Sequence, residues 1–152
     1  MSIKQVKIVG YAHSDEQFIV NANNFKVRIS KNSRPELEGP SPLEYVLAGY
    51  AGCINAVGKL VAKELNLDLK SLQVEIEATL SLDKFQGKVS NNRAGFQEVE
   101  VVVKPTSDAS QEDLQKWISI VKNRCPIHDN LVNPTPIHLN LVPQYETLEL
   151  VS

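Results

Sequence analysis

The strongest constraint on the fold is a long apolar segment, residues 42–65, whose middle is built from small side chains. The sequence SPLE at residues 41–44 predicts a helix start, because serine is a preferred N-cap, proline suits the first helical position and the glutamate completes a capping box. Apolar residues then recur at helical spacing until about Leu65. The small residues in the middle would let another element approach the backbone closely: Ala48, Gly49, Ala51, Gly52 and Ala56. We therefore expect a buried central helix.

Alternation of apolar and polar residues predicts strands on both sides of this helix. Three short alternating segments lie within residues 6–29 and are typical of a β-meander. Two longer ones, 72–80 and 99–103, follow the helix, and each should have one buried face. A further alternating segment, 137–141, predicts a strand near the C-terminus, and the tail 146–152 is expected to add an edge strand.

Two more helices are expected in the second half of the chain. Ser110 predicts the N-cap of an amphipathic helix that ends near Arg124, because Pro126 cannot continue it. A short helix over residues 126–132 follows. Strands and helices thus fall in separate runs, which favours an α+β fold over alternating βαβ units. No internal repeat or long linker divides the chain, so we expect a single domain spanning residues 1–152.

Charge and composition argue against several classes of function and location. The formal net charge of −2 at pH 7 argues against nucleic-acid binding, which normally needs a basic surface. The first residues, MSIKQVKIVG, lack a long apolar core behind a basic flank, so we expect no signal peptide and a cytoplasmic location. The apolar segment 45–62 contains Asn55 and Lys59, and we do not expect it to span a membrane.

The two cysteines, Cys53 and Cys125, are the residues most suited to chemistry. A reducing cytosol disfavours a structural disulfide, so they are either two buried apolar side chains or a reactive pair. Cys53 lies on the predicted central helix, where burial alone would leave a thiol inert. Cys125 is the predicted N-cap of the short helix, whose positive end favours negative charge on sulfur, and Arg124 adjoins it. An ordinary helix cap beside a solvated arginine is the alternative.

His128 follows Cys125 closely, but no second close pair of ligands accompanies them, so we expect no zinc site. His128 is either a group that tunes Cys125 or a surface residue of the short helix. The chain has no GxSxG sequence and no glycine-rich phosphate loop. We therefore expect neither serine-hydrolase chemistry nor a bound nucleotide.

Two segments together carry a family resemblance. Residues 39–69 contain Pro-x-Glu leading into the small-residue helix with Cys53, and residues 110–131 place Cys125-Pro126 after an amphipathic helix. Their order and spacing, with alternating strands between them, resemble the osmotically inducible protein C (OsmC) family and its organic hydroperoxide resistance (Ohr) branch. The resemblance implies an OsmC-like fold, with an antiparallel sheet packed against a long buried central helix. It also implies an intertwined homodimer with active sites at the interface.

The resemblance further implies a thiol-dependent peroxidase that reduces organic hydroperoxides to alcohols. Cys53 would be oxidised to a sulfenic acid, and Cys125 would resolve it as a disulfide. A dithiol reductant, in this family a lipoylated protein or a similar small dithiol, would recycle the pair. No metal, organic cofactor, nucleic acid or membrane is implied. The alternative is an OsmC-fold protein that binds a small apolar or electrophilic ligand without peroxidase turnover.

Members with this activity use an arginine to stabilise the peroxidatic thiolate and a glutamate to hold that arginine. The resemblance assigns the arginine's role to Arg34, whose distance from Pro42 matches one branch of the family with a one-residue gap. It assigns the glutamate's role to Glu44, which lies one residue closer to Cys53 than the glutamate of the best-described branch. On an ideal helix the segment from Glu44 to Cys53 turns through about 900°, which places the two on opposite sides. Glu44 therefore either reaches an arginine folded over the helix start, or acts across a dimer, or only completes the capping box with Ser41.

Overall fold

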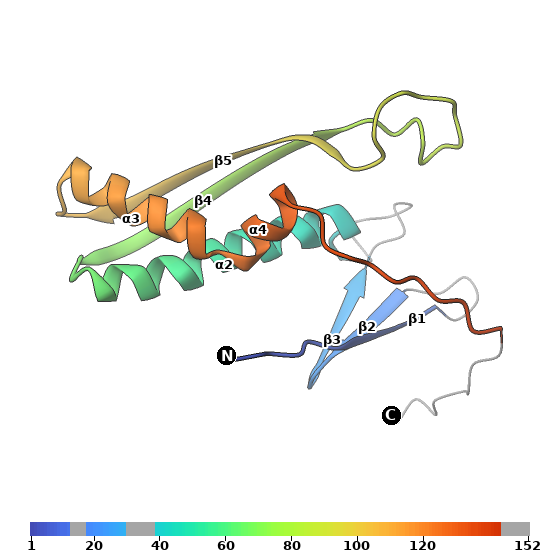
Figure 1. The fold of residues 1–152 in the computed structure, drawn as a ribbon, viewed down its shortest axis with the longest axis horizontal. Helices are drawn as coiled ribbons and strands as arrows, with labels where there is room; N and C mark the ends of the chain where they lie inside the picture. The colour runs from blue at the N-terminus through green and yellow to red at the C-terminus, as the bar shows by residue number, and fades with distance from the viewer. Residues whose placement is uncertain (13–17, 30–38, 144–152) are drawn as a thin grey trace.

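A computed structural model describes residues 1–12, 18–29 and 39–143 of the chain (Figure 1). Strands and helices occur in separate runs, which confirms the predicted α+β class. In chain order the elements are β1 (Ile8–Tyr11), β2 (Phe18–Ala22), β3 (Phe25–Ile29), α2 (Pro42–Glu64), β4 (Leu69–Leu80), β5 (Phe96–Ser107), α3 (Gln111–Arg124) and α4 (Pro126–Val132).

The N-terminal strands form the predicted meander, an antiparallel sheet in the order β1-β2-β3. Asn23 turns the chain between β2 and β3 with a positive φ of 52°, a conformation that asparagine tolerates better than most residues. This small sheet lies beside the N-terminal end of α2, away from the other strands (Figure 1). The Tyr45 hydroxyl of α2 donates a hydrogen bond to the Arg28 carbonyl of β3 at 2.8 Å and joins the two parts.

The second sheet is a long hairpin of β4 and β5, and α2 and α3 pack against it (Figure 1). Alternation decides its faces: Val74 pairs with Val103 and points to the helices, whereas Glu75 and Glu77 point to solvent. The buried core lies between the two helices and contains mainly their own residues: Tyr50, Ile54, Val61, Ala62, Trp117, Val121 and Cys125.

Three helix starts confirm the predicted caps. Ser41 and Glu44 form a reciprocal capping box at the start of α2. Ser110 caps α3 by accepting from the Asp113 backbone N–H at 3.1 Å. Cys125 is both the C-cap of α3 and the N-cap of α4, because Pro126 ends one helix and begins the next. Local sequence signals thus fix where each helix begins.

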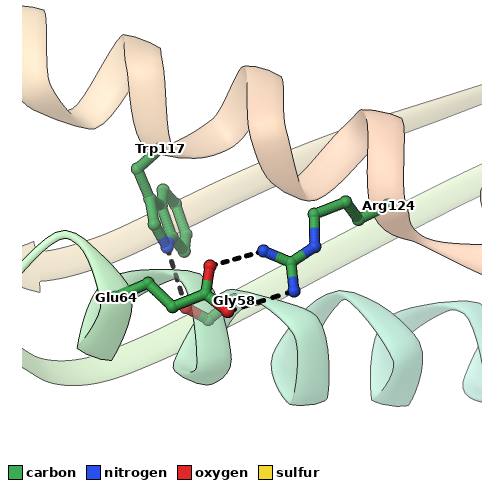
Figure 2. A network of polar contacts seen from close by, with 4 residues as sticks. All are labelled: Gly58, Glu64, Trp117 and Arg124. Carbon is green, nitrogen blue, oxygen red and sulfur yellow. Dashed lines mark hydrogen bonds and ion pairs between the residues drawn. The ribbon is translucent and has the colours of Figure 1, made fainter.

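Trp117 of α3 packs closely against Gly58 of α2. The Trp117 indole N–H donates to the Gly58 carbonyl at 2.8 Å, and a Cβ built on Gly58 would lie 3.0 Å from the indole ring (Figure 2). Close by, Arg124 forms a two-pronged ion pair with Glu64, at 2.5 and 3.2 Å (Figure 2). The hydrogen bond and the ion pair hold α3 against the C-terminal half of α2.

We expect Gly58→Ala to destabilise the protein. The buried indole cannot move away without losing its hydrogen bond, and overpacking of this kind costs about 1–3 kcal/mol, which exceeds the helix-propensity gain of up to about 1 kcal/mol. Urea unfolding should therefore show a lower midpoint. Gly95→Ala is the matched control, because its Cβ would only meet a mobile arginine side chain and should change stability by less than about 0.5 kcal/mol. Equal midpoints for both variants would contradict the packing argument.

The predicted central helix is buried along one face. One face of α2 packs on α3 and β4, but Val46 is 43% exposed and Leu60 is 48% exposed on the other side. Space is open where Gly49 and Gly52 would carry a Cβ, so among the glycines of α2 only Gly58 has another element packed closely against it. By length and composition α2 could cross a membrane, although its packed face is also what a core helix of a globular protein shows.

The strand predicted for residues 137–141 is wrong. The segment is irregular and pairs with no strand in the described part of the chain, and Leu139 is 97% exposed. Alternation supplies a strand pattern, but a strand also needs a sheet edge to pair with. The predicted edge strand at 146–152 lies outside the described residues.

Candidate redox site

The two cysteines meet between α2 and the start of α4. Their Sγ atoms are 2.8 Å apart, and both are free thiols. Cys125 is 1% exposed, whereas Cys53 is half-buried. A disulfide has sulfurs about 2.05 Å apart, so a small further approach would join them. The two sulfurs therefore lie where sulfur–sulfur chemistry can occur.

The boundary between α3 and α4 places Cys125 beside Cys53 of α2. The Cys125 backbone N–H closes the last turn of α3 on Val121 at 3.0 Å, and the Cys125 side chain then caps α4. The His128 backbone N–H donates to the Cys125 sulfur at 3.4 Å. The Ile127 backbone N–H is directed to Cys53. The first turn of α4 thus supplies one backbone donor to each sulfur.

Burial raises the pKa of the Cys53 thiol. The hydrogen bond that the Cys53 thiol shares with Cys125 and the charge on that cysteine raise the pKa further, and the Ile127 backbone N–H lowers it. No lysine or arginine in the described part of the chain contributes to the shift. These surroundings favour the neutral thiol, so a reactive thiolate would need a further positive group.

Tyr50 and His128 flank the two sulfurs, and the sequence analysis did not identify Tyr50 as a site residue. The Tyr50 hydroxyl is 2.6 Å from Nδ1 of His128, and the two rings are tilted by 36°. His128 is half-buried. One signal was available: each ring lies three positions from a cysteine on its own helix, which places it on the same helix face.

An apolar cleft of about 300 Å³ opens beside Cys125. The thiol of Cys53 is not part of its wall, although the sequence suggested an apolar setting around that residue. A second hollow of about 370 Å³ shares the walls made by Tyr50 and His128 and extends to Arg93. Apart from Cys125, Tyr50 and His128, the walls of the first cleft are Ile54, Val99, Val101, Val103, Ile118, Val121 and Lys122.

Of the charged residues considered for the site, Glu44 and Arg124 lie in the described part of the chain and Arg34 does not. Glu44 is exposed, and its carboxylate accepts from the Ser41 backbone N–H at 2.7 Å, as the capping alternative predicts. Arg34 lies outside the described residues, so its role and that of Glu44 toward Cys53 stay predictions. Arg124 adjoins Cys125 in sequence, but its guanidinium binds Glu64 (Figure 2).

Comparison with known proteins places this geometry in context. The sequence model of the family described as OsmC-like protein matches residues 31–140. The chain is 21% identical over 138 residues to a hydroperoxide reductase of Mycoplasma pneumoniae, covering 91% of this chain and 94% of the relative. It is 27% identical over 117 residues to the organic hydroperoxide resistance protein OhrB of Bacillus subtilis, covering 77% of each.

Solved structures share the fold. A crystal structure of an OsmC-like protein from Mycoplasma pneumoniae superposes with a TM-score of 0.76 at 21% identity, covering 86% of this chain and 89% of the other. The structure of Bacillus subtilis OhrB gives a TM-score of 0.54 at 20% identity, covering 84% and 90%. The fold of this chain is therefore a recurrent one.

Proposed function

The chain belongs to the OsmC-like protein family, and from that premise we propose that it is a thiol-dependent peroxidase that reduces organic hydroperoxides to alcohols. The observation that carries the proposal is the 2.8 Å separation of two free thiols on different helices. Relatives named hydroperoxide reductase and organic hydroperoxide resistance protein support it. A cytoplasmic location is part of the proposal, because a reducing compartment keeps the resting thiols reduced.

The proposed cycle begins at Cys53, because Cys125 is almost fully buried and Cys53 is not. The Cys53 thiolate attacks the distal oxygen of the hydroperoxide, the O–O bond breaks, and the departing alkoxide takes a proton to become an alcohol. The Cys53 sulfur keeps the transferred OH as a sulfenic acid. Cys125 then attacks that sulfur, and the S–O bond breaks with loss of water as the disulfide forms.

A dithiol returns the enzyme to its resting state. One of its thiolates attacks the disulfide to give a mixed disulfide, and its second thiol displaces the protein sulfur. The dithiol leaves oxidised and both cysteines regain their protons. Because the apolar cleft reaches Cys125, a dithiol on an aliphatic chain, such as a lipoyl group of another protein, is the reductant that we propose.

Counting free thiols tests the proposal. Reduced protein mixed with cumene hydroperoxide should lose both thiols rapidly, and a dithiol should restore both. The alcohol should form in equal amount to the peroxide consumed. Retention of both thiols would overturn the peroxidase and leave the alternative, an OsmC-fold protein that binds a small apolar or electrophilic ligand without turnover.

A homodimer is the second part of the proposal. Apolar surface that no described residue covers lies on the outer face of α2, at Leu43, Val46 and Leu60, and along residues 137–142. Contiguous exposed apolar surface usually marks an interface, and open space at Gly49 and Gly52 would admit a closely packed element. Light scattering should give twice the 16.9 kDa chain mass. A particle of one chain mass at micromolar concentration would contradict the dimer.

A further inference from the structure

The Tyr50–His128 pair has no part in the cycle as proposed so far, yet it touches both cysteine-bearing helices. We propose that the two side chains form a proton relay for the disulfide-forming step, taking the proton from the Cys125 thiol and returning it to the hydroxide that leaves Cys53. This inference rests on the proposed peroxidase cycle and assigns two further residues to it.

The first support is position. Tyr50 lies three residues before Cys53 on α2, and His128 lies three residues after Cys125 at the start of α4. The 2.6 Å hydrogen bond between the Tyr50 hydroxyl and His128 Nδ1 joins the two helices directly. Through its backbone N–H, His128 also contacts the Cys125 sulfur at 3.4 Å. The pair is therefore held in place by the same turn that holds Cys125.

The second support is electrostatic. Tyr50 is only 7% exposed, and burial raises the pKa of its phenol. The charges of Cys125 and, to a smaller degree, Cys53 raise the pKa further. The phenol therefore stays protonated at neutral pH, and Tyr50 lines the same cleft as Cys125 and His128. A hydroxyl that is hydrogen-bonded to a histidine can accept one proton and give up another without becoming charged itself.

The chemistry of resolution needs such a group. Cys125 is oxidised and Cys53 reduced as the S–S bond forms and the S–O bond breaks. The Cys125 proton must leave as its sulfur attacks, and the departing hydroxide must gain a proton to become water. In the relay, the Cys125 proton moves through water in the cleft that Tyr50, Cys125 and His128 share, and then through the Tyr50 hydroxyl to His128. The same pair then protonates the hydroxide, so that the step releases one water and no net proton.

Other charged groups around His128 bear on its protonation. Lys122 of α3 shares the apolar cleft with it, and Asp129 is its neighbour on α4. Arg93 and Glu98, from the end of the hairpin loop and from β5, line the second hollow beside it. These four side chains are exposed, so solvent screens their charges. Both hollows border the ring, which gives His128 a route for proton exchange with water.

The test separates the two chemical steps. Reduced protein is mixed with cumene hydroperoxide and quenched at intervals from pH 5.5 to 8.5, and mass spectrometry counts sulfenic acid and disulfide. In the wild type, the rate constant of disulfide formation should show an inflection with pH, because a relay that receives a proton needs the neutral imidazole. His128→Gln should slow that step by about 100-fold and abolish the inflection.

Two further variants make the result decisive. Tyr50→Phe removes only the hydroxyl and should slow disulfide formation by a similar factor, even if His128→Gln disturbs α4. His138→Gln, which changes the exposed histidine of the irregular C-terminal segment, should leave the wild-type rate and pH profile intact. Wild-type disulfide formation with the same pH profile in both His128→Gln and Tyr50→Phe would overturn the relay alone. Absence of sulfenic acid in the wild type would overturn the proposed function, and the relay with it.

Discussion

Replacing Cys53 with serine should abolish hydroperoxide reduction, whereas Cys125→Ser should stop the reaction after one oxidation. A serine hydroxyl is not ionised near neutral pH, so Cys53→Ser removes the nucleophile and should lower the rate by about 1,000-fold or more. In Cys125→Ser the peroxide can still react with Cys53, but no thiol stands 2.8 Å away to resolve the sulfenic acid. That variant should consume one equivalent of peroxide and accumulate a product that dimedone traps.

The pair of variants also decides which cysteine acts first. If Cys53→Ser accumulates a sulfenic acid on Cys125 and Cys125→Ser is inert, the two roles are reversed. Ala56→Ser serves as the control, because it adds a hydroxyl to the same helix at an exposed position and leaves both thiols in place. It should keep wild-type peroxide consumption and wild-type thiol loss. A Cys53→Ser protein that still reduces peroxide at the wild-type rate would overturn the proposed mechanism.

The parts of the fold that the sequence predicted are those set by neighbouring residues. The capping box at Ser41 and the change of helix at Cys125-Pro126 depend on contacts within four residues, and both occur as predicted. Alternation likewise assigned the faces of β4 and β5, because a strand repeats every two residues. Such signals need no knowledge of the rest of the chain.

What the sequence could not predict depends on partners far along the chain. The alternating residues 137–141 form no strand because no described sheet edge pairs with them. The Tyr50–His128 hydrogen bond joins residues 78 positions apart. In the sequence, a tyrosine on an apolar helix face is equally consistent with core packing. Small residues predicted a close approach over two turns of α2, yet among the glycines of this helix only Gly58 meets a neighbour in the described chain.

Arg34→Ala should move the ionisation of Cys53 to higher pH and slow its oxidation. The described surroundings raise the Cys53 pKa, and only the Ile127 backbone N–H opposes them. A thiolate at neutral pH therefore needs a cation from elsewhere, and Arg34 is the residue that the family resemblance assigns. An opposite charge within about 4–6 Å changes a pKa by 1–3 units, so its loss should slow oxidation at pH 7 by about 10-fold or more.

Iodoacetamide alkylation followed across pH in a Cys125→Ser background measures this ionisation with one thiol present. Arg28→Ala is the matched control, because Arg28 is exposed on β3 and its backbone carbonyl keeps the bond from Tyr45. An unchanged alkylation midpoint in Arg34→Ala would show that Arg34 is not the partner of Cys53. Glu44→Gln then separates the two roles of Glu44, since glutamine also completes a capping box. If Glu44 orients Arg34, Glu44→Gln should raise the midpoint as Arg34→Ala does; if it only caps α2, the midpoint should stay at the wild-type value.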